Sequence, residues 1–187
     1  MRIIATFGSE SVAGYTIAIR LIIFTLLPAW GLSNATATLV GQNLGAKEPE
    51  RAIRSVNIAA VMAGIFLGFI SIFYLLFAPD FIRFFDDTPA VLEAGTTALR
   101  IFAIGYAMYG FGMIFSQAFN GAGDTRTPMI INVISFWITE LPLGYLLGIH
   151  LGLGVAGVTW SIIAGETMLT LLAYILFRQG KWLKTEV

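Results

Sequence analysis

The sequence predicts an all-α polytopic membrane protein with five transmembrane helices. Five apolar runs fill most of its 187 residues, and each is at least as long as a membrane span. A bilayer core about 30 Å thick is crossed by roughly 20 helical residues. Three runs, at 21–46, 55–78 and 101–123, contain no charged side chain. The runs at 127–149 and 151–177 contain one each, Glu140 and Glu166.

The composition excludes several classes of protein. Only 12% of the residues are charged, and 57% are apolar, whereas a soluble domain carries about 25% charge. The formal net charge of zero argues against a nucleic-acid partner. The chain has no Cys and a single His, His150, so it has no set of ligands for a transition metal. We expect no cofactor, no metal site and no enzymatic activity, and the lipid bilayer is the first expected partner.

The apolar runs predict helices and not strands, because a barrel strand needs only about 9–11 alternating residues. Pro49 and Pro89 each stand where a helix can begin, since the first turn tolerates a missing N–H. In chain order, the predicted helices are 12–42, 53–78, 90–121, 126–148 and 154–178.

The first predicted helix contains Pro28 near its middle, and the fourth contains Pro142. Prolines at such positions occur in the broken helices of transporters. They also occur as plain kinks that set helix packing. The sequence leaves both interpretations open, as a structural hinge or a kink.

A tight hairpin is predicted between the third and fourth helices, followed by Arg126 in the next helix. Two glycines can end the third helix, while Asp124 or Thr125 caps the fourth. The segment is not a phosphate loop, because it lacks the Lys-Ser/Thr ending and a preceding strand. The hairpin residues are Gly121, Gly123, Asp124, Arg126 and Pro128.

The distribution of Lys and Arg predicts the orientation of the chain in the cell membrane. Seven basic residues are expected on one side, which should be cytoplasmic. They are Lys47, Arg51, Arg54, Arg126, Arg178, Lys181 and Lys184. The C-terminus is then cytoplasmic and residue 1 external, an arrangement that would be natural for the end of a longer multi-pass protein.

Glu140 is the first candidate for chemistry. It lies two residues before Pro142, which removes the hydrogen bond to the carbonyl of Ile138. An ionisable group at mid-membrane depth costs roughly 2.5–3.5 kcal/mol on insertion scales. The carboxyl group beside a freed carbonyl could receive a proton or a cation. The alternative is a structural glutamate that is protonated or paired with Arg.

Glu166 and the membrane amides are the remaining candidates for a substrate or ion pathway. Glu166 is central in the last run, where ion handling and a helix-to-helix hydrogen bond are both plausible. The amides of Asn34, Gln117 and Asn132 can bridge helices or line a cavity. If Glu140, Gln117 and Asn34 shared one inward face with aromatic residues, a cavity role would be supported. A Glu140 away from the cleft would contradict its part in that role.

Three motifs together resemble those of multidrug and toxic compound extrusion (MATE) transporters. They are the stretch 39–46 followed by Arg51-Ala52, the stretch 120–128 followed by Asn132 and Pro142, and Gly180-Lys181-Trp182. Their order and spacing agree with the family over residues 10–183. The resemblance implies twelve helices in two six-helix lobes. This chain looks like helices eight to twelve, an incomplete six-helix lobe that lacks the N-terminal lobe as its partner.

The resemblance also implies a function. The family exports organic cations and other amphipathic compounds in exchange for protons or sodium, by alternating access. Its coupling acids lie in the first helix in one branch, and in helices seven and ten in another. In the second branch these acids hold sodium. The stretch similar to helix ten, near 90–121, has no acid in its membrane part, which favours a proton-coupled or non-sodium branch. Glu140 and Glu166 do not match coupling positions of the family.

Two alternatives stay open. One is a lipid-linked oligosaccharide flippase of the same superfamily. The other is a truncated membrane fragment that inserts, or pairs with another subunit, without transporting anything.

Overall fold

The computed structural model describes residues 2–184, in which every regular element is helical. Five helices are long and apolar enough to cross a membrane, which confirms the predicted fold class. In chain order the elements are α1 (Arg2–Ala5), α2 (Ser9–Gly45), α3 (Pro49–Arg83), α4 (Pro89–Gly121), α5 (Arg126–Asn132), η1 (Val133–Glu140), α6 (Leu141–Tyr145), η2 (Leu146–His150), α7 (Gly154–Gln179) and η3 (Lys181–Lys184). The elements from α5 to η2 form one continuous span, Arg126–His150.

The first two long helices extend further than the sequence predicted. α2 runs from Ser9 to Gly45 instead of 12–42, and α3 runs from Pro49 to Arg83 instead of 53–78. Polar and charged residues at these ends continue the helix beyond the apolar run, because only the bilayer core requires apolar side chains. Pro49 and Pro89 do begin α3 and α4.

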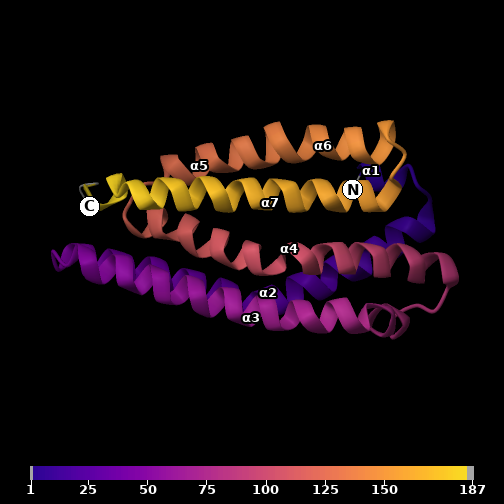
Figure 1. The fold of residues 1–187 in the computed structure, drawn as a ribbon, viewed down its shortest axis with the longest axis horizontal. Coiled ribbons are helices and arrows are strands. Elements are labelled where there is room, and N and C mark those ends of the chain that lie inside the picture. Colours follow the sequence, from indigo (N-terminus) through magenta and orange to yellow (C-terminus); the bar gives the residue numbers. More distant parts are fainter. Residues whose placement is uncertain (1, 185–187) are drawn as a thin grey trace.

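α4 is the central helix of the bundle and packs against α2, α3 and α7 (Figure 1). In its most apolar window 61% of the residues are buried, against 17–33% in the other four spans. One apolar cluster surrounds the first half of α4, with Leu67 and Leu99 fully buried. A second surrounds the other half, where Ile114 and Phe119 pack towards Trp182. The outer faces of the other helices are rich in exposed Phe, Ile and Leu, as expected for side chains in contact with lipid.

The two membrane prolines have different consequences. α2 continues as a single α-helix from Ser9 through Pro28 to Gly45 and is not broken there. Around Pro142, however, the span is not a regular α-helix. The preceding segment, Val133–Glu140, is a π-helix, and Leu146–His150 is a second one. In i→i+5 geometry the carbonyl that Pro142 leaves without its backbone partner belongs to Trp137 and not to Ile138. A kink in α3 at Phe77 (φ −113°, ψ 17°), two residues before Pro79, was not predicted.

Three hydroxyl groups join α2, α3 and α4 inside the membrane region. Thr25 Oγ1 lies 2.6 Å from the hydroxyl of Tyr106 and 3.1 Å from that of Tyr74. Tyr106 also donates to the carbonyl of Ile22, and Tyr74 donates to that of Leu21, both at 2.9 Å. The cluster therefore ties both neighbouring helices to the same turn of α2.

We expect Tyr106→Phe to lower the free energy of unfolding by about 1 kcal/mol, the typical net value of a hydrogen bond between membrane helices or in a protein interior. Thermal unfolding of the purified chain in lipid nanodiscs would measure the change. Tyr145→Phe is the matched control, because Tyr145 is 56% exposed. Equal effects of the two variants would show that the hydroxyl cluster does not hold the helices together.

Candidate functional site

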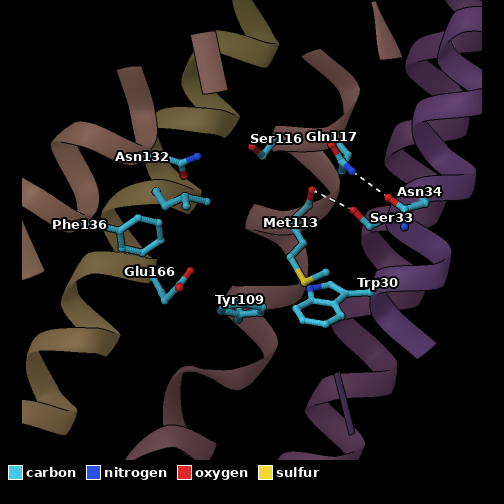
Figure 2. A pocket seen from close by; sticks show the side chains of 11 residues that line it. Trp30, Ser33, Asn34, Tyr109, Met113, Ser116, Gln117, Asn132, Phe136 and Glu166 are labelled. Atoms are coloured by element: carbon cyan, nitrogen blue, oxygen red, sulfur yellow. Dashed lines mark hydrogen bonds between the residues drawn. The ribbon is translucent and has the colours of Figure 1, made fainter. Parts of the chain in front are cut away.

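A cavity of about 260 Å³ opens between α2, α4, α7 and the α5–η1 segment (Figure 2). Its wall combines one carboxyl group, three amides, two serine hydroxyls, four aromatic or sulfur-containing side chains and one leucine. The lining residues are Trp30, Ser33, Asn34, Tyr109, Met113, Ser116, Gln117, Asn132, Phe136, Glu166 and Leu169.

Hydrogen bonds between α2 and α4 hold the polar side of the cavity in place. Gln117 Nε2 donates to Asn34 Oδ1 at 2.9 Å, and Asn120 in turn donates to Gln117 Oε1. One turn away, Ser33 Oγ donates to the carbonyl of Met113 at 3.3 Å. Figure 2 shows the Gln117–Asn34 and Ser33–Met113 contacts on one side of the cavity, with Glu166 and Phe136 across from them. The amide groups are thus oriented before any ligand binds.

Four of the five predicted pathway residues lie together, and the fifth does not. Asn34, Gln117, Asn132 and Glu166 all line the cavity. Glu140 is absent from its wall and packs instead against Gly165 of α7. The wider π-helical turns of η1 direct it there. Glu140 is therefore not among the residues that line this cavity, and its part in a substrate or ion pathway stays a prediction.

Glu166 and Tyr109 also border a second cavity of about 180 Å³. Apart from these two residues and Tyr106, its wall is apolar, with isoleucines from α2 and α7. The carboxyl group of Glu166 thus marks the boundary between a polar cavity and an apolar one. This position could not be read from the sequence.

The predicted hairpin connects α4 and α5. Gly121 ends α4, and Gly123 has a positive φ of +80°, which favours glycine. Asp124 accepts hydrogen bonds from the N–H and the hydroxyl of Thr127, at 3.0 and 2.6 Å. The side chain that accepts a hydrogen bond from a backbone N–H at the start of α5 is therefore that of Asp124 and not that of Thr125.

Arg126 and Pro128 both lie in the first turn of α5. Pro128 is buried, whereas Arg126 is exposed. The one ion pair among the described side chains joins Arg83 and Asp80. Arg126 therefore forms no ion pair with the described side chains that would hold the hairpin in place.

Seven lining residues were not predicted from the sequence. They are Trp30, Ser33, Tyr109, Met113, Ser116, Phe136 and Leu169. A helical pattern could have found many of them. Trp30 lies four residues before Asn34, Met113 four before Gln117, and Phe136 four after Asn132. Residues at that spacing share a helix face. Each predicted amide therefore indicated a second lining residue on the same face of its helix.

The cavity is suited to an organic cation in its chemistry. Cations are attracted to the faces of Trp and Tyr, more strongly where water is excluded. Glu166 can supply a full negative charge, and the amides can accept or donate hydrogen bonds. Among residues 2–184 no group of three or more His, Asp or Glu side chains could hold a metal ion.

Comparison with known proteins agrees with the geometry. The MatE family model matches residues 1–146. The chain is 29% identical over 180 residues to the probable multidrug resistance protein NorM of Thermotoga maritima, covering 96% of this chain and 39% of that protein. It is also 29% identical over 185 residues to the uncharacterized transporter YisQ of Bacillus subtilis, covering 97% and 40%. The chain thus spans about two-fifths of the length of these relatives.

Solved structures show the same fold. A mutant of the Vibrio cholerae MATE transporter VcmN superposes with a TM-score of 0.88 at 22% identity, covering 96% of this chain and 40% of that one. A MOP superfamily transporter from Pyrococcus furiosus superposes with a TM-score of 0.87 at 20% identity, with the same two coverages.

Proposed function

Since this chain belongs to the MatE family of transporters, we propose that it forms part of a secondary active antiporter that exports small organic cations across the cell membrane. The observation that carries the proposal is the cavity, in which Glu166 faces oriented amides and lies among aromatic side chains. The remaining part of the transporter would come from the rest of a protein of the relatives' length. The two parts would then rock against each other around the bound cation.

The charge of Glu166 favours a cation over a neutral or anionic substrate. It is the one carboxyl group among the lining residues, and no Lys or Arg accompanies it there. Within a membrane, a charge interacts more strongly with a nearby opposite charge than in water, because the effective dielectric constant is lower. Trp30 and Tyr109 supply the aromatic faces that a quaternary ammonium group prefers.

The distribution of basic residues supports an orientation with a cytoplasmic C-terminus. The α2–α3 connection, the α4–α5 hairpin and the last described element, η3, lie at the same end of the bundle (Figure 1). That end includes Lys47, Arg126 and Lys181. An excess of Lys and Arg is typical of cytoplasmic loops. We therefore propose that the amide-rich part of the cavity, near Asn34 and Gln117, lies towards the cytoplasmic side.

Binding of benzyltrimethylammonium tests the proposal on the chain itself. Its neutral isostere, neopentylbenzene, has the same shape without the charge. With the chain in lipid nanodiscs, we expect benzyltrimethylammonium to change the fluorescence of Trp30 saturably, and neopentylbenzene to do so weakly. Trp30→Phe should remove the signal, because Trp182 is buried and Trp137 and Trp160 lie outside the cavity.

Two results would contradict the proposal. One is equal binding of the charged and the neutral compound. The other is binding of a lipid-linked oligosaccharide with no binding of the cation, which would indicate the flippase instead. Transport itself is tested by replacing the aligned region of the Thermotoga maritima relative with this chain and measuring export of a fluorescent cation from vesicles. A folded chimera that binds the cation without exporting it would exclude a transport role for this part.

A further inference from the structure

Glu140 of η1 packs against Gly165 of α7, the residue directly before Glu166. A Cβ atom at Gly165 would lie 3.0 Å from the Cβ of Glu140 and 3.1 Å from its Oε2. The missing side chain therefore lets the Glu140 carboxyl group rest against the α7 backbone. Glu166 is the next residue, and its carboxyl group is near enough to Glu140 for the two to interact electrostatically. Two acidic side chains from different helices thus share one small region.

A buried hydroxyl group without a partner lies in the same region. Ser135 is fully buried, and its Oγ has no hydrogen-bond partner in the structure. It lies five residues before Glu140, one turn of the π-helix η1, and its carbonyl oxygen is 3.1 Å from the position of a Cβ at Gly165. Buried polar groups in folded proteins are nearly always paired, so this hydroxyl is an unused hydrogen-bonding group of η1 beside Gly165. Single π-helical turns inside α-helices occur often at functional sites.

The other groups that face the pair carry no positive charge. Tyr15 of α2 is near enough to Glu140 to interact with it electrostatically, and Tyr109 of α4 is near enough to Glu166. Among the described side chains, the one ion pair is the exposed Arg83–Asp80. Two neighbouring carboxylates in a medium of low dielectric constant cannot both remain ionised without a counter-charge. The described protein supplies none at this place.

We propose that Glu140 and Glu166 share one exchangeable proton, and that an organic cation entering the cavity releases it. The second half rests on the proposed function, whereas the shared proton does not. Sodium is the other occupant to test, because the two carboxyl groups and the hydroxyl and carbonyl of Ser135 are oxygen donors of the kind that hard cations take.

The exchange is balanced in charge and atoms. In the resting state one carboxyl group of the pair holds the proton in an O–H bond, and the other is ionised. When a cation binds beside Glu166, which lines the cavity, that O–H bond breaks. The proton passes to water in the cavity, and its bonding electron pair stays on the carboxylate. One positive charge enters as one leaves, so the charge of the site is unchanged. Glu140 does not line the cavity. It acts by changing the proton affinity of Glu166 and is therefore a positioning residue.

The shared proton is tested without any ligand, by infrared spectroscopy of the whole chain in lipid nanodiscs during a pH titration. We expect the wild-type carboxylic acid signal to titrate as a coupled pair. Glu140→Gln and Glu166→Gln should each change the proton affinity of the remaining carboxyl group by about tenfold or more, which is one pH unit. The double variant should lose the coupled component of the signal, and Glu50→Gln, which removes an exposed acid of α3, should leave that component unchanged.

Two further outcomes decide the proposal. If the signals of the single variants add up to the wild-type titration, the two groups are independent and the shared proton is refuted. If sodium abolishes the carboxylic acid signal at constant pH, the pair holds sodium instead. Ser135→Ala, which removes only the unpaired hydroxyl oxygen, should alter the titration midpoint.

Proton release is tested separately with benzyltrimethylammonium in weakly buffered solution. Wild-type chain should release about one proton per bound cation at a pH where the pair is protonated. Glu140→Gln should bind the cation with an affinity that depends less on pH, and should release fewer protons. Unchanged release from this variant would overturn the coupling. If no cation binds to any variant, the proposed function fails, while the ligand-free titration still decides whether the proton is shared.

Discussion

Replacing Glu166 by Gln should weaken the binding of benzyltrimethylammonium by about tenfold to a hundredfold, or roughly 1.4–2.7 kcal/mol. The substitution keeps the size of the side chain and a hydrogen-bonding group but removes the only carboxyl group in the cavity wall. Affinity for the neutral isostere should not change, because Trp30, Tyr109 and the amides remain. The fluorescence titration of Trp30 measures both affinities in the same samples.

Glu93→Gln is the matched control for this prediction. Glu93 is an exposed acid at the other end of α4, outside the cavity. Its loss changes the net charge of the chain by the same amount as the loss of Glu166. If both variants weaken cation binding equally, the effect comes from the overall charge, and Glu166 has no special role. If neither does, the cavity recognises the cation through aromatic contact alone.

Replacing Gly121 by Leu should prevent α2 and α4 from packing at their hairpin end. A Cβ at Gly121 would lie 2.4 Å from the carbonyl oxygen of Ala37, 2.8 Å from its Cα and 2.9 Å from its carbonyl carbon. These are backbone atoms, which cannot move aside as a flexible side chain can. Overpacking in a well-packed interior costs about 1–3 kcal/mol, and we expect this variant to lie at or above the upper end.

Thermal unfolding in nanodiscs measures the effect, and Gly45→Ala is the control. Gly45 lies in α2 at the same end of the bundle, and a Cβ there would meet no atom within 4 Å. Ala is the better helix former by about 1 kcal/mol, so this variant should be neutral or slightly more stable. An unchanged unfolding temperature for Gly121→Leu would mean that Gly121 only ends the helix, as the sequence alone suggested. Separation of α2 and α4 should also break the bond between Gln117 and Asn34, and with it the order of the cavity.

The sequence determined how many helices cross the membrane and where each begins and ends to within a few residues. The reason is local: a stretch of apolar residues in lipid must satisfy its own backbone hydrogen bonds, and it can do so alone only as a helix. The helix starts at Pro49 and Pro89 and the turn at Gly123 follow from the conformations that these residues allow. The extra turns of α2 and α3 lie outside the bilayer core, where the apolar pattern gives no information.

The tertiary structure alone decided which of the two membrane glutamates faces the cavity. The free-energy cost of placing either residue in the bilayer is about the same, because each is a single ionisable residue in an apolar run. In η1, which is π-helical, Glu140 packs against Gly165. Glu166, on α7, lines both cavities instead. Helix rotation depends on contacts between segments far apart in the chain, such as the approach of Gly121 to Ala37. Those contacts have no local signature, so the sequence named the costly residues and only the packing showed which one a ligand can reach.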